Sequence, residues 1–499
     1  MDTEGALGML SSAGIPITQN IEEAGAILVN TCGFLGSAVE ESLETLREMA
    51  RYKRRGRPKK LLVFGCLMER MAETIQARVP EIDAVFGVKP GRPLGEWILE
   101  QLGESERRFE LAPYGVPRLL ATPPHTAYLR VADGCDHECG FCIIPRMRGR
   151  LASRTLESLV SEAEALAARG VVELTLVAQD TSAYGTDLYG RPQLPELVRR
   201  LDQIEGLTWI RLHYLYPASV TDDLSEVMAT ARRVVPYLDM PFQHCDAGIL
   251  KLMRRGGSAR MLLNLVERFR AALPGLVLRT SFIVGHPGEG EAEFDALMDF
   301  VQHIAPDRVG LFRFSPEEEC PSARLPDRPP PAVVEHRFER LAELCTRLCE
   351  QRNAARVGST LQLLVDGPSN LYPDFVRARW AGQSPDVDGL VYYPARGATG
   401  RFLPAVEMTG SGEGGKISPC GRNDSKGWDE EGFLPAVEMT GRAPQKFLPA
   451  VEMTGRAPQR FLPVEMTGGP QPGEFVDAEI IAAEGVDLFS RPAAVPARP

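Results

Sequence analysis

Short apolar runs alternate with amphipathic helical patterns over the first hundred residues. The runs "AGAILVN" (24–30), "LLVFG" (61–65) and "IDAVFG" (82–87) are typical of buried strands. A helical pattern follows the first run from about residue 37 to residue 50, and a second one follows the next run. Strands that alternate with helices predict a parallel sheet, so we expect residues 1–115 to form an α/β domain.

The same alternation returns between residues 121 and 358. Predicted helices include 155–170, 291–304 and a long closing helix at 332–358. Six strands are too few for a complete eight-stranded barrel, so the pattern predicts a partial, open βα barrel. The six predicted strands are 127–133, 172–178, 208–213, 237–240, 277–284 and 307–314.

From residue 359 polar and apolar positions alternate without helical periodicity. This pattern predicts a small β-barrel built from 359–396 and 473–490. Between these two parts, "FLPAVEMTG" occurs three times and "FLPVEMTG" once, and the last three copies begin 14 residues apart. Solenoid repeats usually need roughly 20 residues or more, and this unit is rich in Pro and Gly. We therefore predict a disordered insertion at 397–472, and the near-identity of its copies indicates a recent duplication.

Composition places the chain among ordinary globular proteins, with 44% apolar and 25% charged residues. The net charge of −11 speaks against a large nucleic-acid footprint and favours a basic partner. The first residues, "MDTEGALGML", lack the basic region of a signal peptide, and no apolar run reaches the roughly 18 residues of a membrane span. We expect a cytoplasmic protein without a membrane partner, in a compartment that disfavours disulfides.

One segment departs from this acidic balance. "RYKRRGRPKK" (51–60) has seven basic residues in ten. A solvated connection is the favoured interpretation, and a contact to RNA or another acidic surface is the alternative.

Three cysteines lie close together in "GCDHECGFCIIPRMRGR" (134–150), namely Cys135, Cys139 and Cys142. Disulfides use cysteines in pairs, and a closed zinc site needs four ligands. Three thiolates leave one iron of a [4Fe–4S] cube without a protein ligand, so that iron can bind a substrate or cofactor. The motif follows the first barrel strand, at the end where barrel active sites lie. A zinc site completed by His137 is the alternative.

Two further cysteines end neighbouring strands of the first domain. Cys32 follows the run at 24–30, and Cys66 follows the run at 61–65. Open α/β sheets place ligand sites at the carboxyl ends of their strands, so both residues are candidate ligands. The other five cysteines have no ligand spacing, and core packing is the favoured role for the helical pair Cys345 and Cys349.

Together these motifs resemble the radical S-adenosylmethionine methylthiotransferases. The resemblance rests on "NTCGF" (30–34), "GCLMER" (65–70), the Cx3Cx2C motif and "SFIVGHPGE" (281–289), and it covers about residues 2–396 and 473–490. "NTCGF" and "CxFCxIPxxRG" are similar to the branch that modifies ribosomal protein S12, whereas the transfer-RNA branch more often shows "YCxVPxxRG". The family has an N-terminal α/β domain, a radical barrel and a C-terminal β-barrel of the TRAM type.

The resemblance implies the chemistry and the partners. A methylthio group would be placed on the β-carbon of one aspartate of S12, because an unactivated C–H bond needs a radical cofactor. One S-adenosylmethionine would supply the methyl group and a second would supply the radical. An electron donor such as flavodoxin or ferredoxin is implied, and no specific nucleic acid is expected.

The family also implies a second [4Fe–4S] cluster, held by three cysteines of the first domain. Cys32 and Cys66 match two of them, but the first should lie in a "GCPKNxVDSE"-like stretch, and this chain begins at "MDTEGALGML". "DTE" aligns with "DSE", so the missing cysteine would lie just upstream of Met1. Our hypothesis is that the coding sequence starts earlier, which the upstream DNA would reveal; otherwise sulfur insertion is in doubt.

Other polar residues end barrel strands, although no catalytic side chain can be singled out. Gln179 suits a contact to the methionine part of the cofactor, and Gly285 and Gly288 suit close approach of the adenine. Structural roles are favoured for four strand-end residues, with contacts to ribose or substrate as the alternative: Arg211, His213, Gln243 and His244. The arginines of the cysteine motif could offset the charge of the cluster: Arg146, Arg148, Arg150 and Arg154.

Charge separates the candidate substrates. The predicted C-terminal barrel has three basic and nine acidic residues. A transfer-RNA module should be basic because its affinity comes mainly from phosphate neutralisation, whereas an acidic module suits a basic ribosomal protein. A transfer-RNA methylthiotransferase is the first rival, and a non-enzymatic ribosome- or RNA-binding iron–sulfur module is the second.

Overall fold

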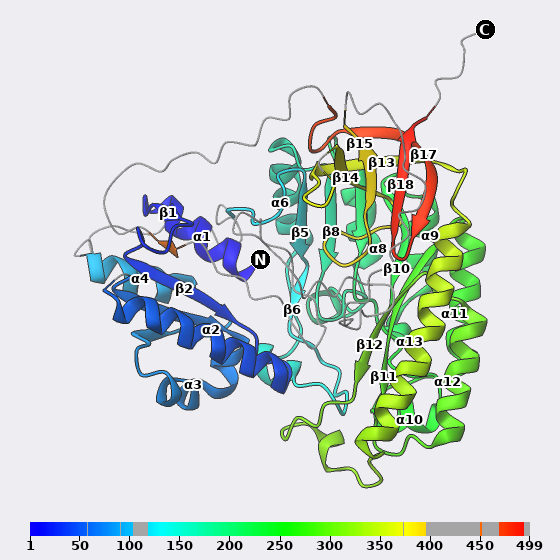
Figure 1. Cartoon of the computed structure of the whole chain (residues 1–499), viewed down its shortest axis with the longest axis horizontal. Coiled ribbons are helices and arrows are strands. Elements are labelled where there is room, and N and C mark those ends of the chain that lie inside the picture. Colours follow the sequence, from blue (N-terminus) through cyan, green and yellow to red (C-terminus); the bar gives the residue numbers. More distant parts are fainter. Residues whose placement is uncertain are drawn as a thin grey trace, which may run out of the picture.

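The computed structural model describes residues 1–56, 58–89, 91–102, 118–372, 374–395, 450–451 and 469–493. They form three parts, an α/β domain, a half-open βα barrel and a small closed β-barrel, so the predicted fold class is confirmed (Figure 1). The predicted insertion at 397–472 lies outside the described residues, apart from 450–451 and 469–472.

The N-terminal sheet has the order β1-β16-β2-β3-β4, in which β2, β3 and β4 are parallel. Leu28 and Leu62 face α1 and α4, while Val29 and Val63 face α2 and α3, so helices cover both faces. Strands buried on both faces read as continuous apolar runs, which explains the sequence pattern. The elements are α1 (Asp2–Ser12), β1 (Ile17–Thr18), β2 (Ala26–Thr31), α2 (Gly36–Arg54), β3 (Lys60–Gly65), α3 (Cys66–Arg78), β4 (Ala84–Val85) and α4 (Gly91–Leu102).

One strand of this sheet comes from the repeat segment. β16 (Ala450–Val451) pairs antiparallel with β1 on one side and β2 on the other. The periodicity of residues 1–115 could not reveal it, because the strand lies more than three hundred positions further along the chain.

The central sheet has six parallel strands in the order β12-β11-β10-β9-β8-β5. Its strands are β5 (Thr126–Arg130), β8 (Glu173–Val177), β9 (Trp209–Leu212), β10 (Val234–Asp239), β11 (Val277–Val284) and β12 (Arg308–Arg313). Its helices are α6 (Leu156–Ala168), α7 (Thr186–Tyr189), α8 (Leu194–Leu201), α9 (Asp222–Thr230), α10 (Ala247–Leu252), α11 (Ala259–Ala272), α12 (Glu291–Ile304) and α13 (Pro331–Ala354). Shorter pieces are β6 (Ala132–Asp133), α5 (Ile144–Arg148), β7 (Ala152–Ser153) and the 3₁₀ turns η1 (Pro217–Ser219) and η2 (Pro321–Arg324).

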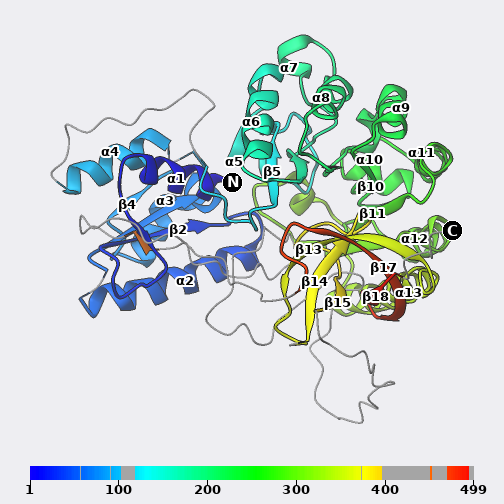
Figure 2. The same ribbon diagram turned by 90° about the horizontal axis from the view of Figure 1, so that it is seen from above.

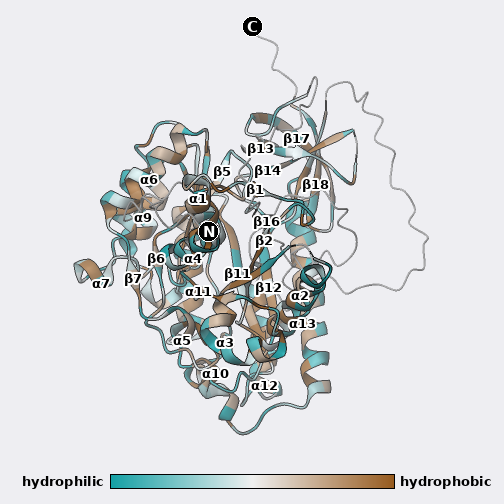
Figure 3. Cartoon of the chain, turned by 90° about the vertical axis from the view of Figure 1, so that its left-hand side faces the viewer, coloured by the Kyte–Doolittle hydropathy of each residue, from teal (hydrophilic) through white to brown (hydrophobic). Residues whose placement is uncertain are grey.

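Helix starts in this region follow from local side chains. Thr155, Asp246 and Ser258 each accept a hydrogen bond from the backbone N–H three residues later, at the starts of α6, α10 and α11. Such caps satisfy backbone donors that a helix start leaves unpaired. Hydropathy differs between buried and exposed elements: Figure 3 shows a largely hydrophobic β11 and a hydrophilic surface on α2.

The C-terminal strands close a barrel in the order β13-β14-β15-β18-β17. Figure 2 shows this barrel on the side of the six-stranded sheet opposite α6, α8, α9 and α11. Trp209, Tyr237 and Val277 of the central sheet pack into the same apolar cluster as Leu363 and Val376 of the barrel. Its strands are β13 (Thr360–Pro368), β14 (Phe375–Trp380), β15 (Val391–Pro394), β17 (Phe475–Glu484) and β18 (Asp487–Pro492).

The connection between β14 and β15, residues 381–390, enters the space enclosed by the six-stranded sheet. We call it the inserted loop. Ser384 Oγ lies 2.9 Å from His213 Nε2, and Asp388 accepts a hydrogen bond of 2.7 Å from the Tyr237 hydroxyl. All four side chains belong to buried residues. The C-terminal barrel therefore fills part of the interior that the open sheet would otherwise leave exposed.

The basic segment at 51–60 is partly neutralised. Lys53 and Lys60 form ion pairs with Asp83, and Arg54 pairs with Glu81. These contacts join the end of α2 to the turn before β4, in agreement with a structural connection. Among the described helices, none is both long enough and apolar enough to cross a membrane.

Candidate active site

The three motif cysteines lie on a loop, residues 134–150, that follows β5 and β6 at the carboxyl end of the central sheet. We call it the cysteine loop. β6 pairs with β7, and the Cys135 N–H donates to the Gly149 carbonyl over 3.1 Å, so the two ends of the loop are held together. Gly134 has a φ of 71°, and a Cβ there would lie 2.0 Å from the Arg150 carbonyl oxygen. Only glycine fits this closure.

The middle of the cysteine loop is fixed by two other segments. The Gly140 N–H donates to the Met253 carbonyl at the end of α10, and the Gly140 carbonyl accepts from the Ser322 N–H, each over 2.8 Å. A Cβ on Gly140 would approach the Ser322 hydroxyl to 2.6 Å. The thiols between these anchors are therefore preorganised by contacts far apart in sequence.

The thiols share one environment. Burial, together with negative charge on the neighbouring motif cysteines, raises the pKa of Cys135 to about 11 and that of Cys142 to about 12. Without a cation all protons would stay on these two sulfurs at neutral pH, and iron would have to displace them. Neighbouring thiolates repel one another and are stabilised when iron ions bind between them. Three such thiols therefore fit a [4Fe–4S] cluster.

No group of three or more His, Cys, Asp or Glu side chains among the described residues is placed to hold a single metal ion. Three ligands of a cube bind three different irons and stand farther apart than ligands of one ion. His137, the fourth ligand in the zinc alternative, has its Nε2 2.7 Å from an Asp180 carboxylate oxygen. That nitrogen is committed to Asp180.

A stack of side chains borders the cysteine loop. The His137 ring lies on the Tyr216 ring at 3.8 Å between centroids and 15° between planes. The Arg255 guanidinium lies over the Tyr216 ring at 4.3 Å and reaches Cys139 Sγ with an Nη1–Sγ distance of 3.7 Å. Asp180 also accepts hydrogen bonds from the Ser182 backbone and hydroxyl. The two stacked rings and the guanidinium restrict the movement of the cysteine loop and the access of water to it.

Gln179, predicted to contact the cofactor, follows β8 and is half-buried. Its Oε1 atom is buried and has no hydrogen-bond partner within the described parts of the chain. A buried amide oxygen without a partner costs free energy, so it marks a place where a ligand donor fits. The α-ammonium group of S-adenosylmethionine is such a donor, and the cofactor contact of Gln179 stays a prediction that this atom supports.

Gly285 and Gly288, predicted to lie close to adenine, have φ values of 82° and 88°. A Cβ on Gly285 would lie 2.6 Å from a Val334 methyl group of α13, and one on Gly288 would lie 2.6 Å from a Leu252 methyl group. Backbone conformation and protein packing thus explain both glycines. Contact with adenine stays a prediction for both.

Cys32 and Cys66 are adjacent because they end strands β2 and β3, where Thr31 and Gly65 are partners in register. Burial raises the pKa of each thiol, and the negative charge of Cys32 adds to the rise at Cys66. Cys66 also packs against Ile143 and Met147, in the part of the cysteine loop that follows Cys142. The structure thus brings the two cysteine sets to one interface, with two thiols in the N-terminal set among the described residues.

Several other candidates have protein partners instead of facing an open site. Arg211 is fully buried, pairs with Glu173 at 3.0 Å and donates to the Ala381 carbonyl of the inserted loop. His213 contacts the inserted loop through Ser384. The structural roles favoured for these two residues agree with their contacts to the inserted loop.

The arginines that follow the motif cysteines have varied partners. Arg148 pairs with Asp2 and Asp133, Arg154 with Glu162, and Arg150 with Asp136, while Arg146 is exposed. Arg255, which reaches the motif sulfur, was not predicted. It lies 116 positions from Cys139 in a "RRGG" stretch without chemical signature, so only the fold reveals it.

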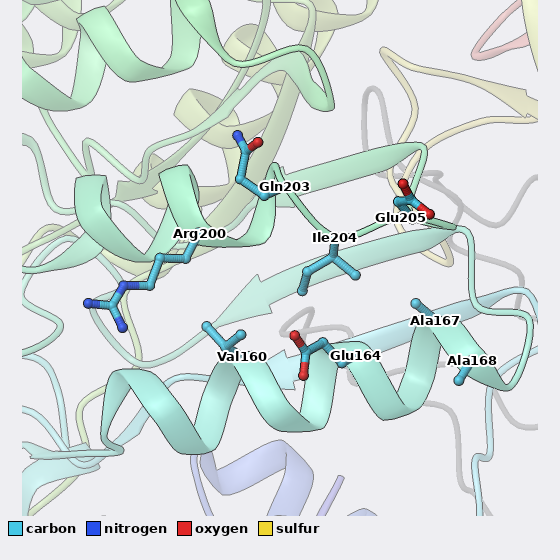
Figure 4. A pocket seen from close by; sticks show the side chains of 8 residues that line it. All are labelled: Val160, Glu164, Ala167, Ala168, Arg200, Gln203, Ile204 and Glu205. Carbon is cyan, nitrogen blue, oxygen red and sulfur yellow. The ribbon is translucent and has the colours of Figure 1, made fainter.

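The described surface has a hollow away from the cysteines. It has a volume of about 360 Å³ between α6 and α8, and its lining mixes apolar and charged side chains (Figure 4). Arg200 and Glu164 lie at its sides, and no motif residue contributes to it. It carries no signal of chemistry.

Comparisons with known proteins agree with the geometry. Residues 129–301 match the Radical SAM superfamily, and residues 1–87 match the Uncharacterized protein family UPF0004. The chain is 42% identical over 398 residues to "Ribosomal protein uS12 methylthiotransferase RimO" of Pelotomaculum thermopropionicum, covering 79% of this chain and 90% of that protein. The protein of the same name from Heliobacterium modesticaldum is 42% identical over 403 residues, covering 79% and 87%.

A solved structure gives a weaker likeness. The radical S-adenosylmethionine methyltransferase TsrM from Kitasatospora setae, determined with cobalamin and a [4Fe–4S] cluster, has 16% identity and a TM-score of 0.44. The match covers 60% of this chain and 65% of that one.

Proposed function

This chain belongs to the radical S-adenosylmethionine methylthiotransferases, and we propose that it places a methylthio group on the β-carbon of an aspartate in ribosomal protein uS12. One observation carries the proposal: the three-cysteine loop lies at the carboxyl end of an open βα barrel in a chain 42% identical to uS12 methylthiotransferases. Because the substrate is a ribosomal protein, the enzyme would work in the cytoplasm.

The cofactors follow from the donor set. Cys135, Cys139 and Cys142 would hold a [4Fe–4S] cluster with one iron left for S-adenosylmethionine. Bound there, the cluster would supply the electron that cleaves the cofactor and yields a radical able to take hydrogen from an unactivated carbon. The chain's own residues keep the loop in place through Gly140 and offer the Gln179 amide oxygen to the cofactor's ammonium group.

Sulfur delivery is a separate part of the proposal. Cys32 and Cys66 would contribute two ligands to a second cluster, next to the part of the cysteine loop that follows Cys142. A small carrier such as flavodoxin or ferredoxin would reduce the radical cluster. Iron and sulfide analysis of the anaerobically reconstituted protein tests the second cluster: iron for one cube only, unchanged by Cys32→Ala, would contradict it.

The C-terminal barrel favours a protein substrate over transfer RNA. Residues 359–396 and 473–490 have three basic residues, Arg377, Arg379 and Arg396, against nine acidic ones, and Arg491 at the end of β18 adds a fourth basic residue. Arg379 is 2% exposed and forms ion pairs with Glu173 and Asp366, so it cannot reach a phosphate. A surface with so few cations does not supply the phosphate contacts that transfer-RNA binding requires, whereas it attracts a strongly basic protein.

The test gives the reconstituted enzyme a choice of substrates. It is incubated with S-adenosylmethionine, dithionite and either uS12 or transfer RNA, and products are analysed by mass spectrometry. We expect uS12 to gain the mass of one SCH3 group in place of one hydrogen, at an aspartate. Modified transfer RNA with unmodified uS12 would support the first rival, and failure to cleave S-adenosylmethionine would support the non-enzymatic module.

A matched pair of variants ties the activity to the cysteine loop. Cys139→Ala should lose the radical cluster and all cleavage of S-adenosylmethionine. Cys345→Ala removes another buried thiol, in α13, and should keep both. Equal cleavage by the two variants would contradict the assignment of the cluster to the loop.

A further inference from the structure

Arg255 lies just beyond the end of α10, in a turn that aims it at the cysteine loop. The Arg255 N–H donates to the Leu250 carbonyl over 2.8 Å, and Arg254 between them has a φ of 54°. A left-handed residue after a helix usually is glycine, and another residue there costs about 1 kcal/mol or more. The same turn presents the Met253 carbonyl to Gly140. Helix end and cysteine loop therefore form one rigid unit.

Three contacts then fix the guanidinium. One nitrogen lies 3.7 Å from Cys139 Sγ, within the range of hydrogen bonds to sulfur, and another donates to the Pro241 carbonyl over 2.7 Å. Its face lies on the Tyr216 ring, which also stacks with His137. A planar guanidinium held at its edge and its face cannot turn away from the sulfur without losing the other two contacts.

The charge of Arg255 is not neutralised by a carboxylate in the described parts of the chain. Within the part of the chain that the structure describes, Arg255 forms no ion pair with an acidic side chain, whereas Arg148 beside Cys66 pairs with both Asp2 and Asp133. Among the described residues, Arg255 is the cation whose hydrogen bond to Cys139 Sγ the structure records. Its full positive charge thus faces one ligand of the radical cluster.

We propose that Arg255 donates an N–H to the Cys139 ligand sulfur and thereby makes the radical cluster easier to reduce. The inference rests on the cluster assigned to the cysteine loop under the proposed function. Reduction adds one negative charge to the cube and its thiolates, and a fixed cation with a hydrogen bond to a ligand sulfur stabilises the reduced form more than the oxidised form. Arg255 is a positioning and tuning residue, which need not touch the substrate.

The reduction potential of the cluster tests the proposal. The holoprotein is reconstituted anaerobically in a Cys32→Ala, Cys66→Ala background, so that only the radical cluster is observed, and is titrated with dithionite under electron paramagnetic resonance. Arg255→Gln should lower the ratio of reduced to oxidised cluster at least tenfold at a fixed potential, which corresponds to 59 mV for one electron. Arg255→Lys keeps the charge and should recover part of the shift.

Arg254→Gln is the matched control, because Arg254 is the neighbouring residue, its side chain is exposed, and the change removes the same charge. It should change the ratio less than twofold. Equal shifts for the two variants would overturn the proposal in favour of general surface charge. An unchanged potential in Arg255→Gln, together with weaker binding of S-adenosylmethionine, would overturn it in favour of a cofactor ligand.

The outcome for the proposed function is separate. If the parent protein binds no cluster, the assignment of the cysteine loop fails. If the parent protein binds one and Arg255→Gln leaves its potential unchanged, only the role of Arg255 fails.

Discussion

The two outer domains are attached to the central barrel by interfaces of opposite character. The C-terminal interface combines a continuous apolar cluster with buried charges, including Arg379 between Glu173 and Asp366. The N-terminal interface has a smaller apolar cluster and ion pairs such as that of Arg70 with Glu317 and Glu319, of which Glu319 is 30% exposed. Interfaces of the first kind hold domains in one arrangement, whereas polar interfaces permit relative motion.

The difference matches what each interface has to do. The C-terminal barrel fills the interior of the open sheet and completes the core. The N-terminal domain brings Cys66 to the part of the cysteine loop that follows Cys142. We therefore expect the C-terminal interface to govern global stability and the N-terminal interface to open first.

Breaking the buried charge chain should have the largest effect. Arg379→Ala leaves Glu173 and Asp366 without the cation that lies 2.7 Å from each of them. Removing one partner of a buried ion pair costs about 3–5 kcal/mol, because the two buried carboxylates keep only Arg211 and His125 as partners among the described residues. Urea unfolding followed by circular dichroism measures the loss.

Arg491→Ala is the control on the rim of the same barrel. Arg491 is 60% exposed in its ion pair with Glu479, so its loss should cost no more than about 1 kcal/mol. Equal losses for Arg379 and Arg491 would contradict the view that burial makes the C-terminal interface strong.

Mild acid should weaken the C-terminal interface next. Burial, followed by the charges of Arg279 and Arg211, lowers the pKa of His213 from 6.5 to about 3. The carboxylates Asp388 and Glu173 oppose this shift without outweighing it. The neutral imidazole is the native form, so its contribution is complete above pH 6.5 and is lost as the pH falls toward 3. Each pH unit in that window costs up to about 1.4 kcal/mol.

Comparing unfolding at pH 6.5 and pH 5 checks this prediction. His213→Gln cannot be protonated and should flatten the dependence by up to about 2 kcal/mol over that interval. If the variant and the parent lose stability in parallel, another group titrates.

A smaller, local effect is expected at the N-terminal interface. The Arg70 guanidinium donates to Glu317, Glu319 and the Gly33 carbonyl, which joins α3 to the segment before η2. Arg70→Ala should cost about 2 kcal/mol, a magnitude typical of hydrogen bonds between charged groups. Hydrogen exchange should rise in α3 while the barrel strands β13, β14, β15, β17 and β18 keep their protection. Faster exchange throughout the chain would show that the two interfaces are not independent.

The smallest effect concerns Asp2, which pairs with Arg130 and Arg148. Burial alone would raise its pKa, but these two guanidinium groups outweigh burial and lower the pKa from 3.8 to about 2. Its contribution is therefore complete above pH 3.8 and is lost as the pH falls toward 2. Asp2→Asn should cost about 1–2 kcal/mol at pH 7 and nothing at pH 2. A cost that persists at pH 2 would point to packing instead of charge.

The sequence revealed those features that depend on neighbouring positions. The six central strands, the cysteine loop and the strand ends at Cys32 and Cys66 all follow from local periodicity and spacing, and the structure has the predicted fold class. The cluster ligands themselves stay predictions. Helical and strand periodicity depends only on residues that are neighbours in the sequence, so it can be recognised without knowledge of the rest of the fold.

Contacts between domains were beyond such patterns. Arg211 and His213 end strands, as candidate site residues do, yet the inserted loop occupies their surroundings. Arg255 has no motif, and its role depends on a helix end that meets a loop 116 positions away. Periodicity describes which face of an element is buried, but it does not name the partner.

The C-terminal barrel closes with strands taken from both sides of the "FLPAVEMTG" copies. β15 ends at Pro394, β17 begins at Phe475, and β15 pairs directly with β18. The barrel can thus close over connections of different length between β15 and β17. Doubling the length of such a connection raises the entropic cost of closing it by only about 0.6 kcal/mol. Natural selection would barely register each new copy, which makes this point of the gene a place where accidental duplications can accumulate.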